Sequence, residues 1–133
     1  MAAKRVDCFF LDVEDKPGVV AEFARQLRDA KINLKSLWAY RTADGKEKIG
    51  CVPQNAKKFV ERAKELGLTT NQSVAFSVSG TDRVGALCTV LDSLANARIN
   101  LKVMDAMSFS GRYGAYVWVD SQEVENAAKA LGA

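Results

Sequence analysis

Histidine is absent from this chain of 133 residues, which restricts the chemistry that its side chains can perform. Histidine is the commonest general acid or base near neutral pH and the commonest transition-metal ligand. Schemes built on Ser-His-Asp, Cys-His or His-metal groups are therefore excluded. Asp12, Glu14 and Asp15 cluster, but they have no paired acid and base spacing and no nucleophile beside them. The sequence predicts a protein that is not an enzyme and holds no cofactor or metal.

The three cysteines also offer little chemistry. Cys8, Cys51 and Cys88 each lie in an apolar stretch, and no two of them form a CxxC pair. An odd number of thiols without a pairing pattern favours buried, reduced cysteines over a disulfide framework. This usage is typical of a cytoplasmic protein.

Charge and hydropathy exclude two further classes of function. Nineteen Lys and Arg against sixteen Asp and Glu leave a net charge of +3, spread along the chain. So small a bias does not predict binding to nucleic acid or to an anionic membrane. No stretch approaches the roughly 20 apolar residues that a membrane span requires, and the N-terminus has no signal-like apolar run. We expect a cytoplasmic location.

An internal repeat determines the organisation of the chain. A shift of 67 positions aligns Asp15–Gly18 with Asp82–Gly85, and Ala30-Lys-Ile-Asn-Leu-Lys35 with Ala97-Arg-Ile-Asn-Leu-Lys102. Nine of the 25 positions from Asp15 to Ala39 are identical in the second copy, without a gap. Such self-similarity indicates a duplicated structural unit.

Both copies show the same order of elements, namely strand, helix, strand, strand and helix. Apolar residues alternate in the strand-like runs and recur at helical spacing in the others. In the first copy these elements are expected at 6–13, 20–30, 34–42, 47–52 and 56–66, and in the second at 73–79, 84–94, 101–109, 113–119 and 124–131.

With a fourth strand, each copy would form the split βαβ, ferredoxin-like fold, an α+β arrangement of an antiparallel sheet with two helices on one face. The predicted boundaries are 1–70 for the first repeat and 71–133 for the second. Only Leu68–Thr70 remains for the fourth strand of the first copy, and nothing remains for that of the second. Either the second repeat has three strands, or another chain supplies the missing edge, which we favour because an unpaired edge invites pairing.

The repeated motifs resemble the signature of ACT domains, which are small ferredoxin-like regulatory modules that bind amino acids and related metabolites. Asp15-x-Pro-Gly18, an amphipathic helix and then Ile32-Asn33-Leu34 carry the likeness in the first copy. Asp82-Arg-Val-Gly85 and Ile99-Asn100-Leu101 carry it in the second, with Val84 where proline is usual. The resemblance covers nearly the whole chain in two copies, and the chain as a whole resembles free-standing tandem ACT proteins that carry no catalytic domain.

The resemblance implies a ligand site at an interface between two modules. A helix N-terminus has free backbone N–H groups that suit a carboxylate, a glycine there allows close approach, and an asparagine amide both donates and accepts. The candidate ligand-binding residues are Asp15, Pro17, Gly18, Val19, Asn33, Leu34, Asp82, Arg83, Val84, Gly85, Asn100 and Leu101.

The aspartates and glycines of these motifs also have purely structural explanations. Capping of the following helix is the favoured interpretation of Asp15 and Asp82. Gly18 and Gly85 suit either close packing of a helix on a strand or close approach of a ligand.

The two asparagines are more informative. Asn33 and Asn100 either adopt a turn conformation that asparagine tolerates or contact a ligand. Their identical placement in the two copies favours ligand contact.

A pair of aromatic residues indicates a further surface. Trp38 and Tyr40 alternate with Leu37 and Ala39, so they should lie on the sheet face away from the helices if Leu37 and Ala39 face the core. We expect this pair to cover a protein interface, or else to be partly buried against the neighbouring repeat.

The sequence therefore favours a non-catalytic sensor that binds a small amino acid or a related carboxylate metabolite. It predicts a homo-oligomer, in the simplest case a dimer, and an effector enzyme that responds to the ligand. The alternative is a regulatory subunit that docks onto a catalytic partner without binding a ligand itself.

Overall fold

The computed structural model describes residues 1–133, which form two compact units. One unit contains residues 7–73, and the other contains residues 1–6 together with 74–133. The repeats expected from the sequence, 1–70 and 71–133, differ from these units at residues 1–6 and 71–73. We propose that 1–70 and 71–133 are the units of duplication. The bounds of the compact units differ from these because two strands each contribute residues to both compact units.

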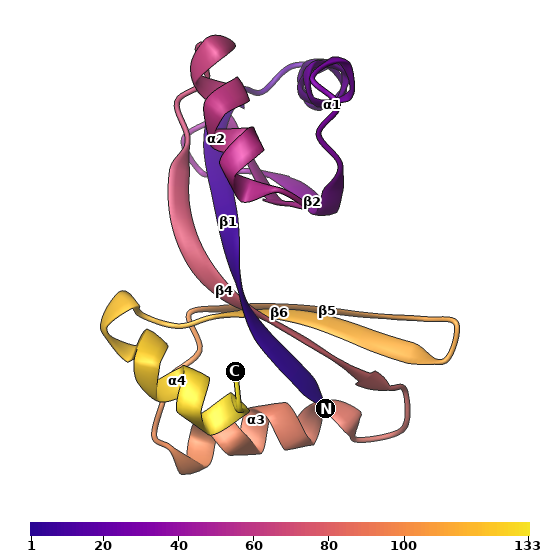
Figure 1. The fold of residues 1–133 in the computed structure, drawn as a ribbon, viewed down its shortest axis with the longest axis vertical. Coiled ribbons are helices and arrows are strands. Elements are labelled where there is room, and N and C mark those ends of the chain that lie inside the picture. Colours follow the sequence, from indigo (N-terminus) through magenta and orange to yellow (C-terminus); the bar gives the residue numbers. More distant parts are fainter. The chain divides into compact units, whose positions relative to one another are not determined.

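The unit of residues 7–73 is built on strands β1, β3 and β2, with helices α1 and α2 packed on the same core (Figure 1). Register pairs Phe9 with Cys51 between β1 and β3, and Leu37 with Cys51 between β2 and β3, both antiparallel. The elements are β1 (Ala2–Glu14), α1 (Val19–Asp29), β2 (Leu34–Arg41), β3 (Lys46–Pro53) and α2 (Ala56–Glu65).

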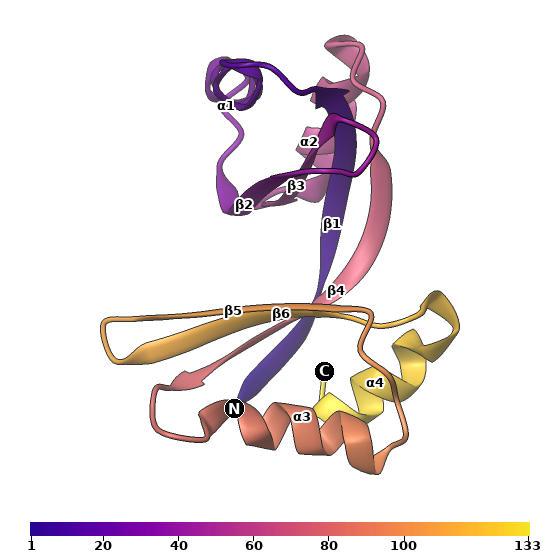
Figure 2. The ribbon, with the colours of Figure 1, turned by 180° about the vertical axis from the view of Figure 1, so that it is seen from behind.

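The second unit repeats this arrangement. Helices α3 and α4 lie on one face of its sheet, and β5 and β6 form a long hairpin (Figure 2). The elements are β4 (Asn71–Thr81), α3 (Ala86–Asn96), β5 (Val103–Phe109), β6 (Arg112–Trp118), a 3-10 turn at Ser121–Glu123 and α4 (Val124–Leu131).

The strand order β2-β3-β1-β4-β6-β5 confirms the predicted ferredoxin-like class. Residues 7–14 of β1 and 71–73 of β4 belong to the first unit, and residues 2–6 of β1 and 74–81 of β4 belong to the second. Each unit thus has four strands in the order expected for a split βαβ fold, with the fourth strand taken from the strand that begins the other unit.

Two expectations about the missing strands were wrong. The fourth strand of the first unit is the start of β4, at 71–73, and Leu68–Thr70 precedes β4 without being part of a strand. The open position beside β4 in the second unit is filled by Ala2–Val6 of the same chain, so no other chain is needed there. This strand was not predicted from the sequence, because the alternating apolar pattern of Ala2–Arg5 is short. Three of these four side chains are exposed.

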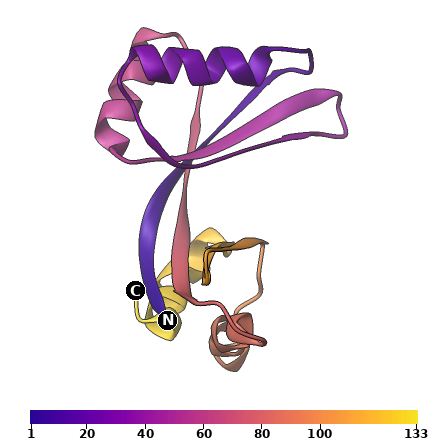
Figure 3. The ribbon, with the colours of Figure 1, turned by 90° about the vertical axis from the view of Figure 1, so that its right-hand side faces the viewer.

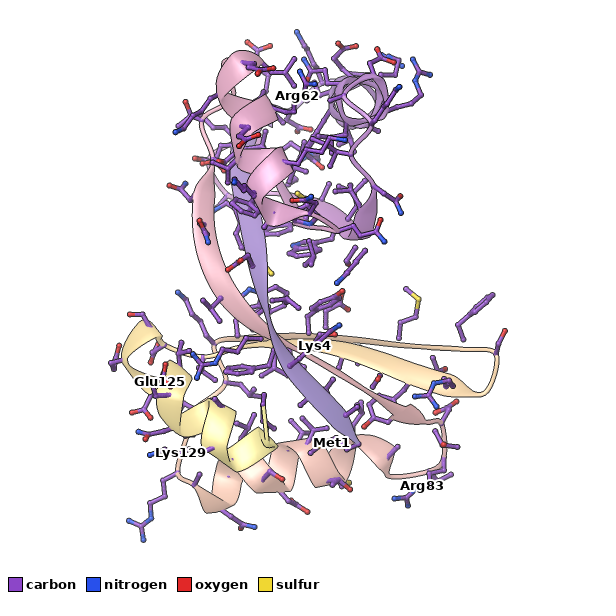
Figure 4. The ribbon with its side chains drawn as sticks, in the orientation of Figure 1. Met1, Lys4, Arg62, Arg83, Glu125 and Lys129 are labelled. Carbon is purple, nitrogen blue, oxygen red and sulfur yellow. The ribbon has the colours of Figure 1, made fainter.

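An ion pair fastens this N-terminal strand to α4. The Arg5 guanidinium donates to both carboxylate oxygens of Glu125, at 2.8 and 2.6 Å. Because of this hydrogen bond, the pKa of the Glu125 carboxyl lies below its ordinary value and that of Arg5 lies above its own. Figure 4 shows Glu125 and Lys129 projecting from α4. Ala3 adds an apolar contact to the core of this unit.

Each core is formed by the helix-facing side of its sheet. In the first unit Phe9 and Phe59 are fully buried with ring centroids 4.6 Å apart, a geometry that adds about 1 kcal/mol to the effect of burial alone. Phe76 on β4 and Val117 on β6 pair directly in the second core. Figure 3 shows α1 extended along β2 and β3, where Phe23 and Leu27 meet that core.

The helices α1 and α3 end in the same way, which explains the repeated Ile-Asn-Leu motif. Lys31 and Arg98 both have φ of 58°, in the left-handed region. The N–H of Ile32 donates to Leu27 O at 2.9 Å, and the N–H of Ile99 to Leu94 O at 3.0 Å. This is the Schellman ending of a helix, with the following isoleucine buried.

No helix of the structure has both the length and the apolar character needed to cross a bilayer.

Removal of residues 1–6 should loosen the second unit and leave the first intact. Its sheet would lose the strand beside β4, so we expect faster amide hydrogen exchange along Val74–Thr81. Amides of β3 that pair with Phe9–Glu14 provide the internal control, since that part of β1 remains. Equal loss of protection in both regions, measured by NMR, would contradict the assignment of residues 1–6 to the second unit.

Candidate functional site

The turn between β1 and α1, together with the first residue of α1, holds four of the candidate residues. Gly18 is the N-cap of α1 with φ of 88°, and no side chain caps the helix. The N–H of Val19 donates to Lys16 O at 3.4 Å, whereas the N–H groups of Val20 and Ala21 have no acceptor in the chain. The first turn of α1 therefore presents backbone donors and the positive end of the helix dipole.

Asp15 does not cap α1, so the interpretation favoured from the sequence was wrong. Its Oδ2 lies 2.6 Å from Arg41 Nε, and its side chain is 27% exposed. Arg41 is the last residue of β2, so the ion pair joins the β1–α1 turn to the far end of that strand. An exposed pair of this kind adds at most about 1 kcal/mol to stability.

An open groove adjoins this turn. It has a volume of about 500 Å³ and is lined by Asp12, Val13, Glu14, Asp15, Lys16, Gly45 and Lys46. Within it Lys16 pairs with Glu14 at 3.0 Å. Both signs of charge are available within one small volume, which suits a ligand that carries an ammonium and a carboxylate.

The equivalent turn of the second copy has the same backbone. Gly85 is the N-cap of α3 with φ of 79°, again without a side-chain cap, so Asp82 does not cap either. The backbone N–H of Asp82 donates to Gly111 O at 2.9 Å. Arg83 points away from the ribbon in Figure 4, and Val84 is fully exposed.

The left-handed φ explains both glycines, and this explanation was missed from the sequence. A Cβ on Gly18 would meet nothing within 4 Å, and one on Gly85 would meet only Cys88 Sγ at 3.9 Å. Close packing therefore does not require glycine at either position. The open space above Gly18 leaves room for a ligand beside the helix N-terminus.

Asn33 and Asn100 lie elsewhere. Each follows the Schellman ending, and positive φ falls on Lys31 and Arg98, so the turn-conformation explanation of the asparagines was wrong. Asn33 Nδ2 donates to Gln54 Oε1 at 3.2 Å, and Asn33 O accepts from the N–H of Gln54 at 2.9 Å. The Asn100 side chain makes no hydrogen bond and is exposed.

Within one unit the two halves of the candidate site are far apart. Leu34 begins β2 and Arg41, which contacts Asp15, ends it. Seven residue steps along a strand span about 23 Å. Asn33 and Leu34 therefore do not meet Asp15–Val19 of the same copy, and the same topology separates Asn100 and Leu101 (41% exposed) from Asp82–Gly85.

The aromatic pair of β2 occupies the predicted face. Leu37 pairs with Cys51 and Ala39 with Ile49, and these two β3 residues belong to the core, so Trp38 and Tyr40 lie on the opposite face. Leu37 itself is 41% exposed at the edge of the sheet. The Trp38 ring lies over Gly50, where a Cβ would fall 2.3 Å from the ring. It also meets Phe10 edge-on, with centroids 5.6 Å apart. Tyr40 is 50% exposed, and a role for the pair at a protein interface stays a prediction.

The cysteines divide into two kinds, which corrects the expectation that all are buried. Cys8 and Cys51 are fully buried, whereas Cys88 on α3 is exposed. Burial, with the nearby Cys8 thiol, raises the pKa of Cys51 to about 12. None of the three forms a disulfide.

Comparison with known proteins gives matches at the level of structure. No family model and no curated protein sequence matches the chain. A protein from Bacteroides thetaiotaomicron superposes with a TM-score of 0.86 at 18% identity, covering 98% of this chain and 88% of the other. The ligand-free regulatory subunit of aspartate kinase from Thermus thermophilus superposes with a TM-score of 0.67 at 12% identity, covering 98% and 93%.

The regulatory subunit of aspartate kinase from Thermus flavus gives the same TM-score, 0.67, at 13% identity, covering 98% of this chain and 94% of its own. At such identities the likeness shows a shared fold. That fold spans both copies of the repeat.

Gly18→Ala should destabilise the protein by about 1 kcal/mol, because alanine is strained at a left-handed φ although its Cβ would meet no atom. Gly85→Ala should behave alike. Gly114→Ala is the matched control, since Gly114 has no positive φ and equal space around it. Urea unfolding measures the difference, and equal midpoints for Gly18→Ala and Gly114→Ala would refute the backbone explanation.

Alkylation of the native protein at pH 8 should modify one thiol per chain. Cys88 is accessible, whereas Cys51 is buried and has a pKa near 12, so it stays protonated as well as shielded. Intact-mass spectrometry after treatment with iodoacetamide counts the adducts, and Cys88→Ser should reduce the count to zero. Modification of Cys51 before unfolding would show that its strand opens.

Proposed function

From the tandem ACT-type fold, we propose that this chain is a non-catalytic regulatory protein that binds an amino acid or a related carboxylate metabolite at an interface between ACT modules. The observation that carries the proposal is the turn before α1 and α3. In both copies a left-handed glycine starts the helix, no side chain caps it, and backbone donors remain open.

The ligand carboxylate is assigned to the helix N-terminus. The N–H groups of Val20 and Ala21 need an acceptor, and the dipole of an 11-residue helix favours an anion there. The space above Gly18 allows the approach. In the second copy the N–H of Leu87, beside Gly85, is the corresponding donor for a ligand carboxylate.

The ligand ammonium requires an acceptor nearby. Asp15 lies at the same turn, and its carboxylate, which pairs with Arg41 through Oδ2 and is 27% exposed, is the acceptor that we propose for the ammonium. Asn33 and Asn100 complete the site only from another module, because topology separates them from the turn of their own copy. This requirement is the reason for proposing an interface between modules.

Regulation follows if the ligand binds two arrangements of the protein with different affinity, since only such a difference can shift their populations. An effector enzyme would then respond to the favoured arrangement. The fold shared with regulatory subunits of aspartate kinase supports a regulatory role.

A second candidate function is docking onto a catalytic partner without a ligand. Two features of the second copy favour it. Val84 replaces proline and is fully exposed, and Ser108, the counterpart of Arg41, leaves Asp82 without an ion pair.

Thermal unfolding against a panel of free amino acids and metabolic carboxylates separates the two candidates. Ligand at a hundred times its dissociation constant should add about 2.7 kcal/mol to stability, a shift of several degrees in a domain of this size. Absence of a shift with every compound would overturn the ligand proposal and support docking.

Variants then locate the site. Asp15→Asn and Asn33→Ala should weaken binding of a compound that stabilises the protein, without unfolding it. Asn126→Ala on α4 is the control, because it replaces an asparagine outside the candidate site. Asp82→Asn and Asn100→Ala test the second copy, and loss of binding in the variants of one copy alone would show that the two sites have diverged.

A further inference from the structure

The two copies of the glycine turn differ in the charge around their aspartate. Asp15 and Asp82 each stand three residues before the glycine that begins the following helix. The Oδ2 atom of Asp15 lies 2.6 Å from Arg41 Nε, whereas the exposed carboxylate of Asp82 has no ion-pair partner. Neither Arg83 in the turn nor Arg112 at the hairpin pairs with it. One aspartate therefore has its charge compensated by a guanidinium, and the other does not.

The sheets explain this difference, because Arg41 and Ser108 occupy equivalent positions. Each ends a row of three paired residues, one from each strand, that begins two positions before the aspartate. The rows are Val13, Glu47 and Arg41 in the first copy, and Gly80, Tyr113 and Ser108 in the second. A serine hydroxyl carries no charge and is too short to replace the guanidinium. The second copy thus keeps the place of the ion pair but lacks the cation.

The second copy holds its turn by the backbone instead. The N–H of Asp82 donates to Gly111 O at 2.9 Å, which ties the turn to the β5–β6 hairpin. In the first copy the side chains of Asp15 and Arg41 join the turn to the end of β2. Because the turn of the second copy does not need an ion pair, the Asp82 carboxylate remains available to a cation from outside the chain.

The groove beside the first turn has no uncompensated carboxylate. Its three acidic residues, Asp12, Glu14 and Asp15, each lie within ion-pair distance of a basic side chain. The pairs are Asp12 with Lys48 at 3.9 Å, Glu14 with Lys16 at 3.0 Å and Asp15 with Arg41 at 2.6 Å. An ammonium that enters this groove must therefore share a carboxylate with a cation already bound to it.

Charge compensation changes how much a ligand's ammonium contributes to binding. A carboxylate accepts a charged donor more strongly than a neutral one, but a guanidinium already at ion-pair distance repels a second cation. At Asp15 an ammonium competes with Arg41, whereas a hydroxyl in the same place donates to the carboxylate without adding charge. At Asp82 no paired cation opposes the ammonium. A neutral hydroxyl there leaves the charge of the aspartate to repel the ligand's own carboxylate.

On the basis of the function proposed above, we propose that Arg41 sets the ligand selectivity of the first site. The guanidinium lets that site bind a 2-hydroxy acid about as well as the amino acid with the same side chain. The second site, where Asp82 is uncompensated, selects the amino acid. The two copies then respond to two related classes of carboxylate, and Arg41 acts through Asp15 without contacting the ligand itself.

Amide chemical shifts measure the two sites separately in one sample. The N–H of Val20 reports on the first site and that of Leu87 on the second, because neither has an acceptor in the chain. The probes are three matched pairs, namely alanine and lactate, aspartate and malate, and phenylalanine and 3-phenyllactate. The ratio of the two dissociation constants gives the selectivity, and interactions common to both probes cancel. We expect no preference at the first site and an about fivefold preference for the amino acid at the second.

Exchange of the two residues should exchange the selectivities. Arg41→Ser should give the first site an about fivefold preference for the amino acid, and Ser108→Arg should remove the preference at the second. Arg41→Lys should behave as the unaltered protein, because a lysine also compensates Asp15. Arg28→Ser is the matched control, since Arg28 Nε pairs with Asp29 Oδ1 at 3.0 Å in the last turn of α1, away from the glycine turn. A merely structural loss would weaken both members of a pair alike and leave the ratio unchanged.

The outcomes separate this selectivity from the proposed function. If a pair binds but Arg41→Ser leaves the ratio at Val20 unchanged, Arg41 does not set the selectivity, although the ligand site stands. An unchanged ratio at Leu87 in Ser108→Arg would contradict the explanation of the second site in the same way. If no probe at millimolar concentration shifts either amide, the glycine turns bind no such ligand, and the proposed function fails together with the selectivity.

Discussion

The fold depends on two strands, β1 and β4, that are each divided between the two compact units. A split βαβ unit needs a fourth strand, yet each repeat encodes only three. Strand β1 supplies its first residues to the second unit, and β4 supplies its first residues to the first unit. Neither core is complete until both strands have formed, which couples two modules of a size that is marginal alone.

Local rules predicted most of the fold from the sequence. The helical spacing of Phe23 and Leu27, and the repeated Ile-Asn-Leu motif, depend on neighbours within a few residues. The origin of each fourth strand depends on pairing between distant segments, and Ala2–Val6 carries too little apolar signal to show it. At the candidate site, the glycines were recognised but their φ was not, because it is set by how β1 meets α1.

The two copies have diverged at the same structural positions. Trp38 on β2 covers Gly50 on β3, whereas in the second copy the large residue, Tyr116, lies on β6 and faces Asp105. Arg41 forms an ion pair with Asp15, whereas its counterpart Ser108 cannot form one with Asp82. The backbone of the glycine turn is the part that both copies retain. This pattern is expected if one geometry is needed twice while the surrounding surfaces take on different tasks.

The divided strands also affect how the molecule can be handled. A fragment cut at the repeat boundary would leave each half without a strand, so the halves are poor subjects for separate expression. An affinity tag joined to Met1 would emerge beside the sheet of the unit that contains the C-terminus, near the Arg5–Glu125 pair. Residues 1 and 133 therefore belong to the same unit. A fusion at either position would affect that unit before the other.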